Sequence, residues 1–133
     1  MKGLAWLDNI ARPVRWATAL AWMGVIFFLS AQPDLPHPSA GWLDLLISSG
    51  AHTLLYAVLA FLFAWALGAD RRALVLAFVL AVLYAVSDEF HQSFVPGRHP
   101  DPLDLACDAA GAAAALVAWM WLRRQGGGRR GAV

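Results

Sequence analysis

Four long apolar segments divide the chain. Residues 16–32, 45–69 and 73–87 contain no Asp, Glu, Lys or Arg, and residues 103–122 contain only two aspartates. An α-helix needs about 20 mainly apolar residues to cross the hydrocarbon core of a bilayer. The pattern therefore predicts four transmembrane helices, at about residues 16–33, 43–69, 73–93 and 103–122.

The segments are apolar on all sides, and none alternates polar and apolar residues with a period of two, so strands and a soluble bundle are both disfavoured. A helix also satisfies its own backbone hydrogen bonds, as the bilayer requires. The predicted fold class is all-α, a polytopic membrane protein built as an antiparallel bundle of four transmembrane helices. We expect one domain over residues 1–133, ending in a basic, flexible tail at 123–133.

Composition narrows the class of protein. Hydrophobic residues make up 60% of the 133 residues and charged residues 14%, whereas soluble domains carry about 25% charged residues. The single cysteine, Cys107, cannot form an intrachain disulfide and is expected to pack in the apolar interior. The sequence has no Gly-rich phosphate loop and no basic–aromatic pattern typical of nucleic-acid binding. We expect the lipid bilayer as a partner and no nucleic acid.

The positions of the cations predict the orientation. Nine of the ten Lys and Arg residues lie before the first helix, between the second and third, or after the fourth. With four helices these segments share one side, and the positive-inside rule makes it cytoplasmic. The first helix is expected to be a retained anchor, because a signal cleavage site here would place Phe28 or Leu29 where a small residue is preferred. We therefore expect a multi-pass protein of the bacterial plasma membrane with both termini inside.

The opposite side carries the chemistry, namely Arg98, all four histidines and seven of the nine acids. A rise of about 1.5 Å per residue places His52, Asp88 and Asp108 roughly 5 to 8 Å below the outer surface. Ionisable groups at such a depth normally face the bundle interior and pair with one another. The sequence therefore predicts one polar layer, facing outside, to which every helix contributes.

The candidate site residues come from this layer. The candidate catalytic residues are His52, Asp88, Glu89 and His91. The candidate binding residues are Gln32, Tyr56, Gln92, Arg98, Asp104 and Asp108. A divalent metal is a candidate cofactor, with Asp88, His91, His52 and Asp108 as its candidate ligands; nothing else in the sequence indicates a cofactor. Each residue also has a plainer interpretation: Asp104 as a helix N-cap, His52 as a hydrogen-bonded core residue and Arg98 as a solvated loop charge.

Several of these residues stand in a longer pattern that resembles the VanZ-like family of bacterial membrane proteins. The pattern consists of Phe-Phe-Leu-Ser-Ala-Gln-Pro at 27–33, His52 with Tyr56, Asp-Glu-Phe-His-Gln at 88–92, Pro-Gly-Arg at 96–98, Asp104, Asp108 and Gly-Ala at 111–112. Ala51 stands where many relatives have a lysine. The resemblance implies a small multi-pass membrane protein whose functional signature is the Asp-Glu-x-His-Gln segment. It also implies a link to teicoplanin resistance, for which the family is named, but not a particular reaction.

Three functions remain open at this point. The protein would bind or modulate an outer-leaflet headgroup, a lipid-linked envelope precursor or a glycopeptide, with Arg98 on a phosphate, and so lower susceptibility to lipoglycopeptides such as teicoplanin. Alternatively, it is a metal-assisted or acid–base enzyme acting on a lipid-linked headgroup. In the third interpretation the polar layer is an interhelical network, with each hydrogen bond worth about 1 kcal/mol. The sequence does not predict the oligomeric state.

Overall fold

The computed structural model describes residues 4–32, 42–98 and 100–127, and in these residues every regular element is helical. The elements are η1 (Leu4–Asn9), a short 3-10 helix, and the α-helices α1 (Arg12–Ser30), α2 (Trp42–Leu67), α3 (Arg71–Gln92) and α4 (Pro102–Gly127). Each α-helix is long and apolar enough to cross a membrane. The expected all-α fold with four transmembrane helices is confirmed.

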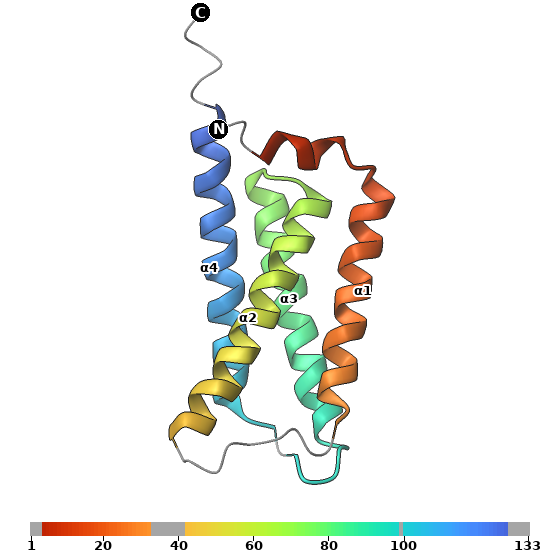
Figure 1. Ribbon diagram of the computed structural model, residues 1–133, viewed down its shortest axis with the longest axis vertical. Coiled ribbons are helices and arrows are strands. Elements are labelled where there is room, and N and C mark those ends of the chain that lie inside the picture. The colour runs from red at the N-terminus through yellow and green to blue at the C-terminus, as the bar shows by residue number, and fades with distance from the viewer. Residues whose placement is uncertain (1–3, 33–41, 99, 128–133) are drawn as a thin grey trace, which may run out of the picture.

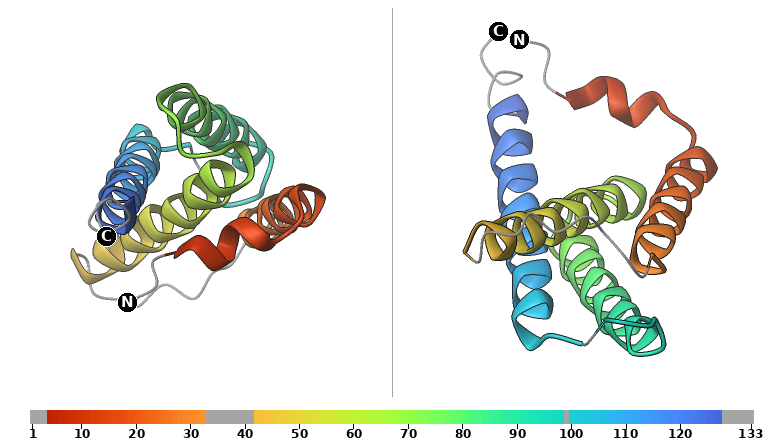
Figure 2. Two further views of the ribbon diagram at one scale, coloured as in Figure 1. Left: turned by 90° about the horizontal axis from the view of Figure 1, so that it is seen from above. Right: turned by 60° about the horizontal axis from the view of Figure 1, so that its bottom comes forward.

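Successive α-helices run antiparallel, and η1 lies across the end of the bundle where α1 begins (Figure 1). Helix α2 occupies the middle: it packs against α1, α3 and α4, and most extensively against α4. The view along the bundle shows the same arrangement, with α2 between the other three helices (Figure 2). The bundle is therefore built around one central helix, and not as a square of four equivalent ones.

Small side chains allow the helices to approach closely. Helix α3 presents a buried alanine every fourth residue, at Ala73, Ala77, Ala81 and Ala85. This spacing keeps the alanines on one face, and small residues at such a face let two helix backbones pack tightly. On α4, a Cβ atom at Gly111 would collide with the backbone carbonyl oxygen of Thr53 in α2. The α2–α4 contact therefore requires glycine at 111.

Large apolar side chains cover the outside of the bundle. Leu54, Phe28, Phe90, Phe94 and Val117 are between 61% and 71% exposed. An apolar surface on this scale would drive a soluble protein to associate. It suits contact with lipid acyl chains, in agreement with the apolar length of the four helices.

Arg15 and Arg12 form hydrogen bonds between helices at the end of the bundle that holds η1. The Arg15 guanidinium donates to the carbonyl oxygens of Asp8 and Ile10 at 2.8 Å each and of Trp65 at 3.1 Å. Arg12 Nε donates to the carbonyl oxygen of Ala66 at 3.3 Å. The last carbonyls of a helix lack intrahelical partners, so these arginines bind η1 and α1 to the end of α2.

Two features at this end differ from the expectation drawn from the sequence. Helix α1 begins at Arg12, with Pro13 in its first turn, where proline is favoured. Helix α4 continues to Gly127, so the expectation of a flexible tail is wrong for residues 123–127; residues 128–133 lie outside the described part. The physical reason is Arg123, which donates to both carboxylate oxygens of Asp8 at 2.7 and 2.9 Å and lies 4.5 Å from the Trp119 ring centroid. The same hydrogen bonds lower the pKa of the Asp8 carboxyl below its ordinary value.

We expect Gly111→Ala to destabilise the bundle by about 1–3 kcal/mol, because the added methyl group meets a backbone carbonyl that cannot rotate away. Gly24→Ala is the matched control, since a Cβ at Gly24 has nothing within 4 Å. That variant should be as stable as the parent or more so, because alanine favours a helix. Thermal unfolding in detergent, followed by fluorescence of the seven tryptophans, measures both. Equal melting of the two variants would contradict the close α2–α4 contact.

Candidate functional site

At the end of the bundle opposite η1, α1 and α3 end and α2 and α4 begin (Figure 1). Polar side chains gather there. The buried polar residues of the described part are Ser30, Asp88, Glu89, Gln92 and Asp108, each no more than 8% exposed. All five lie at this end. Because charged groups are rarely buried without partners, the contacts of each carboxylate decide what the cluster can do.

His52 of α2 and Asp108 of α4 form the closest ionisable pair in this cluster. His52 Nδ1 lies 3.3 Å from Asp108 Oδ1, and His52 Nε2 lies 3.9 Å from Asp104 Oδ2. The first contact lacks hydrogen-bond geometry, and Asp108 Oδ2 has no hydrogen-bond partner among the described residues. Asp108 is 1% exposed, so this carboxylate is buried with its bonding capacity largely unused.

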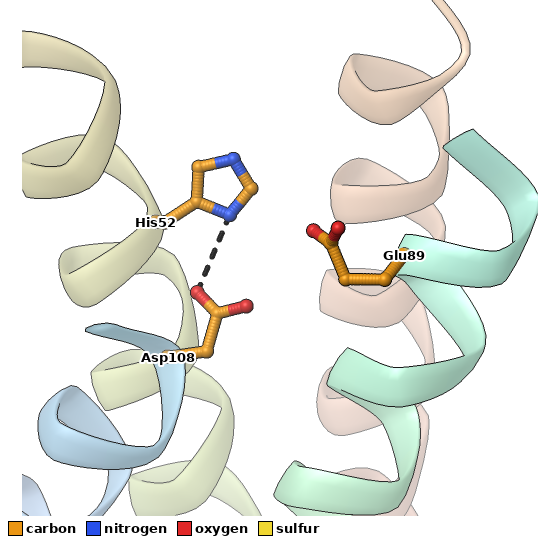
Figure 3. Close-up of side chains that lie close together, drawn as sticks. All are labelled: His52, Glu89 and Asp108. Atoms are coloured by element: carbon orange, nitrogen blue, oxygen red, sulfur yellow. Dashed lines mark ion pairs between the residues drawn. The ribbon is translucent and has the colours of Figure 1, made fainter. Parts of the chain in front are cut away.

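Glu89 of α3 faces the same pair across a short gap (Figure 3). Its Oε2 accepts a hydrogen bond of 2.9 Å from the backbone N–H of Asp101, while its Oε1 is buried and has no partner within the described chain. One ligand atom each of His52, Glu89 and Asp108 lies within 4.8 Å of the others. Three helices therefore bring one imidazole and two carboxylates together.

Asp88 lies outside this group of three and forms hydrogen bonds with other residues. Its Oδ2 accepts hydrogen bonds from Ser30 Oγ at 2.8 Å and from Gln92 Nε2 at 3.2 Å. Successive residues of a helix point about 100° apart, so Asp88 faces α1 whereas Glu89 faces α2 and α4. The hydrogen bond between Ser30 and the Asp88 carboxylate joins α1 to α3.

Three further candidate residues, His91, Arg98 and Tyr56, make contacts of their own. The His91 ring stacks on Phe27 with centroids 4.3 Å apart. Arg98 Nε donates to the carbonyl oxygen of Gln32 at 3.1 Å, and Arg98 Nη2 is buried without a hydrogen-bond partner in the part of the chain described. Tyr56, 1% exposed, packs one turn along α2 from His52, with its ring centroid 6.3 Å from that of Tyr84.

The sequence-based metal hypothesis changes accordingly. Of its four candidate ligands, His52 and Asp108 come together, while Asp88 and His91 are not part of the three-residue group that could hold an ion. Glu89 takes their place. The backbone N–H of Asp101, which fixes Glu89, was not among the candidates, because a backbone donor leaves no signal in residue type. Asp34, His37 and His99, which the sequence places on this side, lie outside the described residues.

We expect Ser30→Ala to lower the free energy of unfolding by about 1 kcal/mol, because it removes a buried donor to Asp88. Ser87→Ala makes the same chemical change on the exposed face of α3, where the hydroxyl bonds only to the carbonyl oxygen of Tyr84 in its own helix. This control should leave stability unchanged. Thermal melting of the two purified variants makes the comparison, and a Ser30→Ala protein as stable as Ser87→Ala would contradict an α1–α3 contact through Asp88.

No curated protein and no solved structure matches the chain. The model of the VanZ/LLP1 family matches residues 15–123, which include all the candidate site residues. The chain therefore belongs to the VanZ/LLP1 family.

Proposed function

We propose that this protein lies in the bacterial plasma membrane with η1 and the α2–α3 turn on the cytoplasmic side, and that its polar cluster faces outside. The support is the distribution of charge along the bundle. Arg12, Arg71, Arg72 and Arg124 are exposed at the end that holds η1, and cationic segments are retained in the cytoplasm. Seven of the nine acids belong to the segments at the other end.

At the outer face the protein binds the headgroup of an outer-leaflet lipid or of a lipid-linked cell-wall precursor. Several buried side-chain atoms at this end have no hydrogen-bond partner among the described residues, including Arg98 Nη2, Glu89 Oε1 and Asp108 Oδ2, and this observation carries the proposal. Buried polar groups normally form hydrogen bonds, and a group that forms none is explained by a ligand, an ion or water. A headgroup provides both the acceptors that Arg98 lacks and the donors that the carboxylates lack.

Arg98 is placed to hold a phosphate. Its Nε is fixed on the carbonyl oxygen of Gln32, which sets the plane of the guanidinium and leaves Nη2 available. Guanidinium binds phosphate in a planar, two-donor geometry and strengthens the contact by its charge. The acids then bind hydroxyl or amine groups of the same headgroup. By occupying precursor headgroups, the protein lowers susceptibility to lipoglycopeptides such as teicoplanin.

The orientation predicts which residues a membrane-impermeant maleimide reaches. In a Cys107→Ala background, Ser93→Cys at the outer end of α3 should react in intact spheroplasts, because Ser93 is exposed on the proposed outer side. Arg72→Cys at the other end of the same helix should react only after the membrane is opened. The reverse order of labelling would contradict the proposed orientation.

Binding through Arg98 predicts that Arg98→Ala loses at least about tenfold in affinity, because a hydrogen bond to a charged group is worth about 1.5–3 kcal/mol. The probe is a fluorescent polyprenyl-diphosphate-linked cell-wall precursor, presented to the purified protein in nanodiscs. Arg124→Ala, which removes an exposed arginine at the opposite end, is the matched control and should bind as the parent does.

The same variants are expressed in a bacterium that lacks its own member of the family, and teicoplanin susceptibility is measured. The parent and Arg124→Ala should lower susceptibility, and Arg98→Ala should not. Melting temperature and elution volume establish that Arg98→Ala still folds. An Arg98→Ala protein that binds the precursor like the parent would refute headgroup binding through this residue.

A further inference from the structure

The group formed by His52, Glu89 and Asp108 contains more acidic than basic side chains. Asp108 is 1% exposed and Glu89 8% exposed, and the only cationic side chain in the group is the imidazole of His52. Asp104 Oδ2 lies 3.9 Å from the other nitrogen of that ring and adds a third carboxylate. Burying carboxylates without compensating charge costs several kcal/mol. A bound cation would therefore stabilise the ionised form of this group.

We propose that His52, Glu89 and Asp108 bind one divalent transition-metal ion of the Zn²⁺ type. Two ligands of a tetrahedral zinc ion, each about 2.0–2.1 Å from it, are roughly 3.3–3.4 Å apart. The 3.3 Å between His52 Nδ1 and Asp108 Oδ1 fits that spacing. Glu89 supplies the third ligand atom, and one ligand atom of each of the three residues lies within 4.8 Å of the others. Glu89 Oε1 has no hydrogen-bond partner among the described residues, while Oε2 accepts from the Asp101 N–H.

The ligand set selects the kind of ion. One imidazole nitrogen with two carboxylates suits zinc and related transition metals, whereas Mg²⁺ and Ca²⁺ prefer oxygen ligands alone. A carboxylate behind a metal-bound histidine commonly fixes the ring and strengthens the ligand. Asp104, whose Oδ2 lies 3.9 Å from His52 Nε2, would take this place as a positioning residue once the ion is bound.

Three protein ligands leave at least one coordination position open, as in catalytic zinc sites. The open position would accept a phosphate or carboxylate oxygen. A metal-bound phosphate would explain how an anionic headgroup enters a cluster rich in acids. This last step rests on the proposed headgroup binding, whereas the metal site itself does not.

The test uses the full chain in detergent, freed of metal with a chelator and then titrated with Zn²⁺ against a chromophoric competitor. We expect one Zn²⁺ per chain and a higher melting temperature in its presence, because an ion that binds only the folded state stabilises it. Co²⁺ should give a visible absorption band that Zn²⁺ removes. Excess Mg²⁺ should compete with neither ion. The parent protein alone supplies these readouts, so they hold even if a variant fails to fold.

The variants locate the site. His52→Ala, Glu89→Gln and Asp108→Asn should each lose the Co²⁺ band and at least about tenfold in Zn²⁺ affinity, and Asp104→Asn should retain the band with about 10- to 100-fold weaker binding. Asp8→Asn, an exposed acid at the opposite end, is the control and should bind as the parent does. No stoichiometric Zn²⁺ binding by the parent, or equal binding by Asp108→Asn and Asp8→Asn, would overturn the proposal.

The outcome is separable from that of the headgroup experiment. If Zn²⁺ binds as expected while Arg98→Ala still binds the precursor, the metal site stands and headgroup binding through Arg98 fails. If Arg98→Ala loses the precursor but the parent binds no Zn²⁺, the metal site fails and headgroup binding stands.

Discussion

The approach of α4 to α2 at Gly111 is the constraint on which the site depends. A side chain at 111 would collide with the carbonyl oxygen of Thr53, which is the residue after His52. Asp108 lies three residues before Gly111, on the same face of α4. The contact that brings the two backbones together therefore also sets the 3.3 Å between His52 and Asp108. The packing of α2 against α4 and the geometry of the site depend on the same contact.

Two adjacent acids on α3, Asp88 and Glu89, make different kinds of contact within the polar layer. Asp88 Oδ2 accepts hydrogen bonds from Ser30 and Gln92, and the bond from Ser30 holds α1 to α3. Glu89 points to the other side and keeps one oxygen without a partner among the described residues. The network and ligand interpretations of the sequence are therefore compatible, because they apply to different faces of the same helix. Only the face with unused polar atoms supports a ligand.

The sequence predicts the four helices well, because membrane-spanning length depends on local hydropathy alone. Counting residues from the membrane surface also placed His52, Asp88 and Asp108 at one end. It could not decide between Asp88 and Glu89 as the partner of His52, because helical spacing orders the faces of one helix without telling which neighbour each face meets. The extension of α4 to Gly127 depends on a contact between Arg123 and Asp8, which are far apart in the sequence. Local sequence patterns do not predict such a contact, because they do not tell which helices are neighbours.

Charged side chains are exposed or paired at the η1 end of the bundle, whereas two acidic side chains are buried at the other end. This difference supports a ligand only at the end with the buried acids. Near η1, Arg71 and Arg72 are exposed to solvent or headgroups, and Arg123 meets an exposed carboxylate of opposite sign. At the other end, Asp108 and Glu89 have the same sign and are both buried. Charges that serve only orientation or packing stay hydrated or paired, since burial raises their free energy. A further charge of opposite sign lowers the free energy of keeping two like charges out of water, which is the role assigned here to the metal ion.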